Sequence, residues 1–169
     1  MRVLVVYHSK TGTCRTVGAE IAKNLKADVD EIIPANARPL YKPDGKMDRL
    51  EMMVCALQTM INWRTKLKPA AKNPADYDLV VIGSPTWAGG VSAPVRSYLS
   101  SHKGLKKVAF FCTMGTSDRS KIASQAVKVF GQMAGLTASP IMTLAVVQKE
   151  ADSEKARKTI KEFAAKTMK

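Results

Sequence analysis

The segment that most constrains the fold lies at the start of the chain, where the β-branched apolar run Val3–Tyr7 leads into a loop of small hydroxylated residues. The loop reads Ser-Lys-Thr-Gly-Thr-Cys at positions 9–14, and apolar residues then recur at helical spacing. The first N–H groups of a helix lack partners inside the helix and carry partial positive charge, so they suit phosphate oxygens. Three hydroxyl groups add further donors, and they belong to Ser9, Thr11 and Thr13. Because Gly12 lets the backbone close around a ligand, this segment predicts a phosphate-binding loop.

Strand-like and helix-like patterns alternate along the remaining chain. Further strands are predicted at residues 28–33, 79–83, 107–112 and 139–147. Further helices are predicted at residues 47–66, at 93–101, after Asp118 up to Gly135, and from about Ser153 onward. The 79–83 run is apolar without alternation, as expected of a strand that is buried on both faces. Five strands alternating with five helices predict an α/β protein with a parallel sheet and right-handed crossovers.

Three loops that follow predicted strands are rich in glycine, serine and threonine, at residues 9–14, 84–90 and 113–118. In doubly wound sheets, ligands bind outside the carboxyl ends of the strands, where the strand order reverses. The three loops meet there only if the first and third strands are neighbours. A three-layer fold with strand order 2-1-3-4-5 and helices on both faces of the sheet is an arrangement that makes them neighbours.

A long segment, residues 34–74, separates the second and third predicted strands, and its first part is marked by Pro39, Pro43 and Gly45. The predicted helix 47–66 follows, and its apolar residues recur every three or four positions. These residues are Leu50, Met53, Val54, Leu57, Met60 and Ile61. We expect this face to pack in the core, and we interpret Met52, Met53 and Met60 as core residues rather than as a soft binding surface.

The length of 169 residues suits one domain, spanning residues 1–169. The apolar runs are far shorter than the roughly 20 residues of a membrane span, and Val3–Tyr7 is too short for a signal-peptide core. We expect a cytoplasmic protein without a membrane partner. Three cysteines without a Cys-x-x-Cys motif or paired histidines favour free thiols over disulfides or a zinc site.

The formal net charge of +13 is high for a chain of this size. Arg64, Lys66, Lys68 and Lys72 form a basic run without an intervening acid. No nucleic-acid motif accompanies this charge, and aromatic residues are few. The charge therefore indicates a solvated basic face or an acidic protein partner, in preference to nucleic acid.

Several known phosphate loops do not match the sequence. The first loop has one glycine, so it lacks the Gly-x-Gly-x-x-Gly dinucleotide motif, and it also lacks Gly-x4-Gly-Lys-[Ser/Thr]. A receiver domain needs carboxylates after the first strand and at the end of the third, where this chain has His8-Ser9 and Gly83-Ser84. The Cys-x5-Arg spacing of tyrosine phosphatases is present, but Ser9 stands in place of the thiolate nucleophile.

The chain instead resembles the flavodoxin family, whose members bind flavin mononucleotide (FMN). Residues 9–14 are similar to the family's [Ser/Thr]-x-Thr-Gly-x-Thr phosphate loop, with Cys14 in place of the final threonine. Residues 76–90 look like the family's third strand and first flavin loop, and 107–118 look like its fourth strand and second flavin loop. The resemblance covers nearly the whole chain. It implies a three-layer fold with strand order 2-1-3-4-5, and FMN at the edge of the sheet where the strand order reverses.

The resemblance implies sixteen cofactor-binding residues in three groups. They are Ser9, Lys10, Thr11, Gly12, Thr13 and Cys14; then Pro85, Thr86, Trp87, Ala88, Gly89 and Gly90; then Thr113, Met114, Gly115 and Thr116. Trp87 is expected to contact the flavin ring rather than to anchor the core, and the peptides of 88–90 to face the flavin nitrogen that takes up a proton. Met114 is expected to cover the ring where many flavodoxins have tyrosine, and Cys14 leaves one phosphate contact to backbone N–H groups.

The roles of Lys10 and of three side chains outside this set are predicted individually. Lys10 either neutralises the phosphate or is solvated. His8 is expected to make a structural loop hydrogen bond, and His102 to lie on the surface. Asp118 is expected to cap the following helix.

Two functions follow from the resemblance. The first is a low-potential electron carrier that passes electrons between redox proteins. The alternative is an NAD(P)H- or partner-dependent FMN reductase that acts on quinones or similar acceptors, and the long 34–74 segment keeps this alternative open. A non-redox module that has lost its flavin is a third class. A basic carrier would favour an acidic partner and associate more slowly as salt increases.

Overall fold

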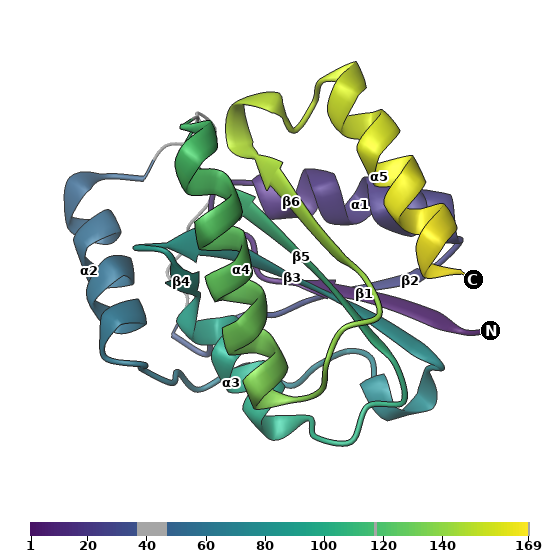
Figure 1. The fold of residues 1–169 in the computed structure, drawn as a ribbon. Helices are drawn as coiled ribbons and strands as arrows, with labels where there is room; N and C mark the ends of the chain where they lie inside the picture. Colours follow the sequence, from purple (N-terminus) through teal and green to yellow (C-terminus); the bar gives the residue numbers. More distant parts are fainter. Residues whose placement is uncertain (37–46, 117, 169) are drawn as a thin grey trace.

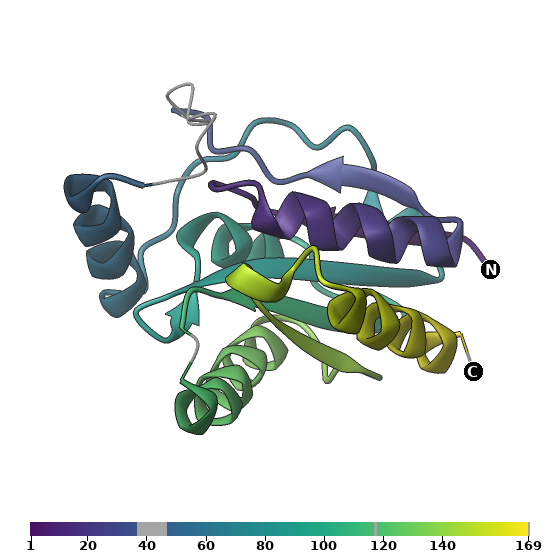
Figure 2. The same ribbon diagram turned by 90° about the horizontal axis from the view of Figure 1, so that it is seen from above.

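Five parallel strands form the centre of the molecule in the order β2-β1-β3-β5-β6, with helices on either side (Figures 1 and 2). The structure is a computed structural model, and it describes residues 1–36, 47–116 and 118–168. The expected order 2-1-3-4-5 is confirmed, because β5 and β6 are the fourth and fifth of the predicted strands. A sixth strand, β4, was not predicted; it has two residues and pairs antiparallel with β3.

The strand bounds differ from the prediction mainly at their ends. The strands are β1 Val3–Tyr7, β2 Asp28–Glu31, β3 Leu79–Trp87, β4 Gly90–Val91, β5 Val108–Met114 and β6 Thr143–Val147. Strands β3 and β5 run further than predicted because each has a partner beyond its apolar run: Trp87 pairs with Gly90, and Met114 pairs with Val147. Strand β6 begins later than predicted, after the bend that follows Pro140.

Two apolar cores lie on the two faces of the sheet. The helices are α1 Thr13–Leu25, α2 Arg49–Met60, α3 Ala93–Ser101, α4 Arg119–Leu136 and α5 Glu154–Thr167. Alternate residues of β1 point to opposite faces, so that Val5 packs with α1 and α5 while Val6 packs with α3 and α4. The predicted three-layer arrangement is therefore confirmed. None of the described helices is long and apolar enough to cross a membrane.

The helix starts agree with the capping residues in the sequence. Ser153 accepts a hydrogen bond on its Oγ from the Ala156 N–H (3.1 Å) at the start of α5. The Asp118 carbonyl accepts from the N–H groups of Lys121 and Ile122 at the start of α4, as expected for the residue that precedes this helix. The predicted connection at 35–45 lies almost wholly outside the described residues.

Helix α2 departs from the prediction. It covers neither face of the sheet but stands at the end of β3, on the side of the molecule away from both termini (Figures 1 and 2). Its buried residues are Cys55 and Thr59. The expected core face is exposed instead, at Leu50, Met53, Val54, Leu57, Met60 and Ile61. The prediction that the methionines fill the core was therefore wrong, because the polar side of the helix packs inward.

Candidate cofactor site

The first loop presents unpaired N–H groups at the start of α1. Gly12 adopts φ 88°, a left-handed conformation that favours glycine, and it offers no side chain to cap the helix. The hydroxyls of Thr11 and Thr13 lie 3.3 Å apart, while the Ser9 hydroxyl accepts from the Arg15 N–H (3.2 Å). The N–H groups of Thr13 and Cys14 have no acceptor among the described residues. The loop therefore has the N–H groups and hydroxyls that could bind an anion without a charged side chain.

The Cys14 side chain points into the core rather than toward a ligand. Its Sγ lies 3.0 Å from Thr113 Oγ1, and it is 1% exposed. Burial raises the pKa of the Cys14 thiol to about 12, so the group stays neutral. The thiol ties the phosphate loop to β5, and only the Cys14 backbone N–H remains for an anion.

Lys10 contacts α2 and does not extend into solvent, which excludes one of its two predicted interpretations. Its Nζ lies 3.7 Å from Glu51 Oε1 and 3.6 Å from Cys55 Sγ, both on α2. The side chain is 12% exposed, so it is not solvated. These contacts join the first loop to α2.

The second loop is a tight β-hairpin. Trp87 pairs with Gly90 across a two-residue turn in which Ala88 and Gly89 have φ values of 46° and 69°. Two successive positive φ values are the geometry of the type I′ turn, which matches the twist of the strands that it joins. Ala88 adopts this conformation at a cost of about 1 kcal/mol relative to glycine. The turn therefore has a fixed backbone shape at the edge of the sheet.

Two helices hold this hairpin in place. A Cβ atom on Gly90 would lie 2.5 Å from Thr59 Cγ2 of α2, so only glycine fits there. The Val91 N–H donates to Gln132 Oε1 of α4 at 3.0 Å. Neither contact carried a signal in the sequence, because each joins residues that are far apart along the chain.

An open cavity of about 560 Å³ lies between the hairpin and the third loop. Its lining residues are Thr86, Ala88, Gly89, Gly115, Thr116, Ser124, Gln125 and Lys128. The first five of these were predicted as site residues. The last three were missed, since they flank the inward face of α4 and have no motif of their own.

Trp87 faces the other side of the hairpin, where a second cavity of about 310 Å³ lies between the first loop and α2. The Trp87 ring stands edge-on to the His8 ring, with centroids 5.8 Å apart. It is only half-buried and lines the cavity together with Lys10, Val54 and Trp63. Trp87 is therefore not a core anchor, in agreement with the expectation.

The third loop corrects one prediction. Met114 is 1% exposed and packs in the core on the α3 and α4 side of the sheet, so it does not cover a ring at the surface. Thr113 is also buried, against Cys14. Gly115 and Thr116 alone reach the cavity, because β5 continues through Met114.

His8 makes the structural hydrogen bond that was expected, with Nδ1 2.9 Å from the Ile32 carbonyl oxygen. Because a carbonyl can only accept, Nδ1 carries the proton and donates. The other histidine, His102, is partly buried rather than fully on the surface, with Nδ1 2.9 Å from the Tyr98 carbonyl oxygen.

Because His8 is buried, we expect the free energy of unfolding to fall as the pH is lowered. Burial lowers the pKa of His8 from 6.5 to about 4, so between these values the unfolded chain binds more protons than the folded chain. The stabilisation is complete above pH 6.5 and falls as the pH drops toward about 4, by about 3 kcal/mol. Urea unfolding of the apoprotein at about pH 7 and about pH 4.5 measures this loss. The matched variant His8→Gln is expected to lose much less over the same interval; an equal loss in both proteins would assign the acid sensitivity to other groups.

The three cysteines are all buried free thiols, as predicted. Burial raises the pKa of Cys14 and Cys112 to about 12 and also raises the pKa of Cys55. At about pH 8 the native protein is expected to react with Ellman's reagent at least about 100-fold more slowly than the urea-unfolded chain. The variant Ser101→Cys, at an exposed position, serves as a positive control with one fast thiol. A fast thiol in the native unsubstituted protein would contradict the buried placement.

The fold is that of a doubly wound α/β protein, a class in which ligands bind at the edge where the strand order reverses. The chain belongs to the flavodoxin family, whose model, described as Flavodoxin, matches residues 2–152.

Solved structures share the fold at low sequence identity. A flavoprotein in complex with FMN from Lactobacillus acidophilus NCFM is 18% identical, with a TM-score of 0.62 over 91% of this chain and 98% of that one. A protein from Bacteroides eggerthii, named as a candidate flavoprotein, is 21% identical, with a TM-score of 0.68 over 97% and 98% of the two chains. Oxidised Flavodoxin 2 from Bacillus cereus is 17% identical, with a TM-score of 0.61 over 99% and 98%.

The residues at the sheet edge fit the FMN that the family implies. The unpaired N–H groups and hydroxyls of the first loop suit a phosphate. The hairpin and the 115–116 peptides offer backbone groups around one open cavity, and Trp87 offers an aromatic ring to the second cavity, on the other side of the hairpin. The strand pairing brings these loops together, because β1, β3 and β5 are neighbours and end at the same edge of the sheet. Tyr7 pairs with Gly83, and Ser84 pairs with Cys112.

Proposed function

We propose that this chain binds FMN at the three loops and acts as a one-domain electron carrier between redox proteins in the cytoplasm. The observation that carries the proposal is the meeting of the three loops at one end of neighbouring strands β1, β3 and β5. Flavins accept and donate electrons singly or in pairs, which is the chemistry that such a carrier needs.

In this proposal the chain supplies binding and orientation. The loop at 9–14 holds the phosphate through neutral donors, since Lys10 is engaged with Glu51. The hairpin sets the position of the 88–90 peptides against the ring, and its contacts with Thr59 and Gln132 keep that position fixed. His8 stays neutral and bonded to Ile32. These roles suit a carrier, in which the protein orients the flavin and does not convert a substrate.

The alternative, an FMN reductase acting on quinones or similar acceptors, is supported by the cavity beside Trp87. Its volume of about 310 Å³ suits a small planar molecule, and two tryptophans, Trp63 and Trp87, line it.

One anaerobic experiment separates the two functions. The purified holoprotein is mixed with NADPH and NADH without any added reductase, and the flavin absorption is followed. A carrier is expected to stay oxidised over minutes, whereas rapid bleaching would favour the reductase.

A second experiment tests whether the redox partner of this basic chain is acidic. Stopped-flow reduction is measured at increasing ionic strength, and the association rate is expected to fall steeply.

A further inference from the structure

One side of α4 lies against the hairpin and carries three polar side chains in a row. Gln132 accepts a hydrogen bond on its Oε1 from the Val91 N–H at 3.0 Å. Gln125 lies at the turn itself, with its Cγ 3.9 Å from the position that a Cβ on Gly89 would take. Lys128 stands three residues after Gln125 and four before Gln132, and residues at these spacings share one face of a helix. The two glutamines therefore place Lys128 on the hairpin side of α4.

Lys128 brings a positive charge to the cavity between the hairpin and the third loop. Of the described residues that line this cavity, Lys128 alone is charged. It forms no ion pair with another described residue. The one carboxylate in the third loop belongs to Asp118, and it lies 3.3 Å from Lys121 Nζ. The described lining of the cavity therefore carries a positive charge that no acidic side chain balances.

A cation at this cavity affects the two oxidation states of a bound flavin differently. When FMN takes up two electrons from a reduced redox protein near neutral pH, one proton is added at its N5 atom and the ring keeps one negative charge. A nearby cation lowers the free energy of the charged reduced ring more than that of the neutral oxidised ring. The midpoint potential rises as a result, because it measures the free-energy difference between the two states.

We propose that Lys128 is the side chain that tunes the two-electron potential of the bound flavin, by stabilising the negative charge of the reduced ring. The inference rests on the proposed FMN site and gives a role to a residue outside the three loops. Because Lys128 is exposed, its charge is partly screened, and we expect it to change the preference for reduced over oxidised FMN by about threefold. The net charge of +13 acts in the same direction. The low potential that the flavodoxin resemblance implies is thereby raised.

Potentiometric titration of the holoprotein with dithionite and a reference dye tests this role. Lys128→Gln is expected to lower the two-electron midpoint potential by about 15 mV, which is the equivalent of a threefold change. Lys128→Glu reverses the charge and is expected to lower the potential by about 30 mV, the equivalent of a tenfold change. Lys128→Arg keeps the charge and is expected to stay within about 1.5-fold, or about 5 mV, of the unsubstituted protein.

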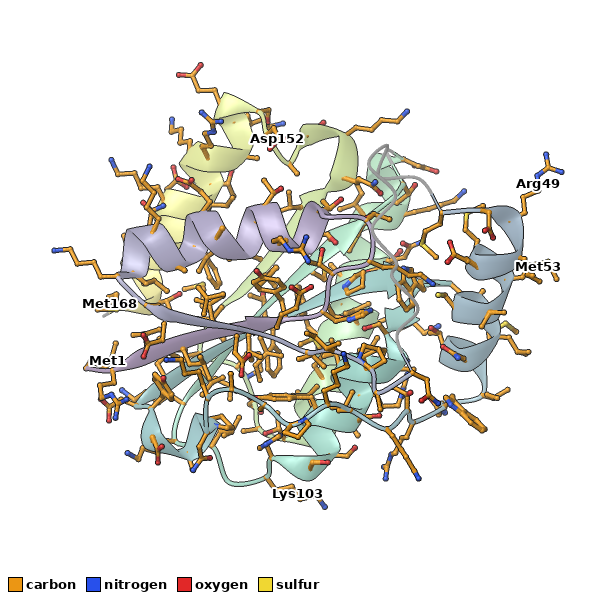
Figure 3. All side chains as sticks on the ribbon, turned by 180° about the vertical axis from the view of Figure 1, so that it is seen from behind. Met1, Arg49, Met53, Lys103, Asp152 and Met168 are labelled. Atoms are coloured by element: carbon orange, nitrogen blue, oxygen red, sulfur yellow. The ribbon has the colours of Figure 1, made fainter. Side chains whose placement is uncertain are left out.

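Lys103→Glu is the matched control for the change in net charge. Lys103 precedes β5, whereas the third loop follows it, so the two lie at opposite edges of the sheet. Figure 3 shows Lys103 extending outward from the molecule. The seven residues of β5 span about 23 Å, well beyond the Debye length of about 8 Å at about 0.15 M ionic strength. The control is therefore expected to keep its potential within about 5 mV, or about 1.5-fold.

The affinity for oxidised FMN separates this inference from the proposed function. Fluorescence titration is expected to give every variant an affinity within about threefold of the unsubstituted protein, because the oxidised ring is neutral and the phosphate is assigned to the first loop. Circular dichroism verifies the folding of each apoprotein. Normal binding with an unchanged potential in Lys128→Glu would overturn the inference and leave the FMN site in place. An equal fall in potential in Lys103→Glu would also overturn it, since the effect would then belong to net charge. Absence of FMN binding in the unsubstituted protein would overturn the site and the inference together.

Discussion

Replacing Gly83 with alanine is expected to lower the free energy of unfolding by about 3 kcal/mol, because the added methyl group has no space. An ideal Cβ on Gly83 would lie 2.0 Å from Phe111 Cζ and within 2.6 Å of two further ring atoms. The Phe111 ring is fully buried in the core on the α1 and α5 side, so it cannot swing into solvent. The change therefore forces β3 and β5 apart at the point where the site begins.

Urea unfolding of the apoprotein measures this loss, and Gly131→Ala is the matched control. Gly131 lies on α4 with no neighbouring atom within 4 Å of its ideal Cβ. Alanine there is expected to stabilise the helix by about 1 kcal/mol. A Gly83→Ala protein that unfolds within about 0.5 kcal/mol of the unsubstituted one would mean that the core accommodates the methyl group.

Replacing Thr11 with glutamate is expected to weaken FMN binding at least about 100-fold. The carboxylate would lie in the loop that we propose for the phosphate, beside the N–H groups of Thr13 and Cys14, which have no acceptor among the described residues. Two like charges about 5 Å apart repel by about 3 kcal/mol at an effective dielectric constant of about 20, which corresponds to about two orders of magnitude in affinity. The affinity is measured by titrating FMN into the apoprotein and following the loss of flavin fluorescence.

Two control variants separate the effect of the added charge from the loss of the hydroxyl and from a change in net charge. Thr11→Val removes the hydroxyl without adding charge and is expected to weaken binding about tenfold, as one lost hydrogen bond would. Thr159→Glu makes the same charge change on the exposed side of α5 and is expected to leave the affinity within about threefold. Unchanged FMN affinity in Thr11→Glu would show that the phosphate lies elsewhere.

The first loop could be predicted from the sequence because it depends on a short-range pattern. The run Val3–Tyr7, the hydroxylated loop and the helix that follows are contiguous, so local rules describe them. The order of the strands came from the resemblance to flavodoxins, and it is the order that lets three glycine- and hydroxyl-rich loops meet at one edge.

The orientation of α2 could not be predicted in the same way. Helical spacing identifies which residues share a face, but it does not say whether that face is covered by the same chain. The inward side is chosen by contacts of Lys10 with Glu51 and of Gly90 with Thr59, which join distant segments. Similarly, Met114 was assigned to a loop because its strand continues only through pairing with Val147.

Comparing FMN with riboflavin tests the proposed site most directly, since the two ligands share a ring and differ only in the phosphate. Fluorescence titration of the apoprotein with each ligand is expected to give an affinity for FMN at least about 100-fold higher than that for riboflavin. Inorganic phosphate is expected to compete with FMN more strongly than with riboflavin. Equal affinity for the two ligands, or no binding of FMN at all, would contradict a phosphate-binding loop at residues 9–14.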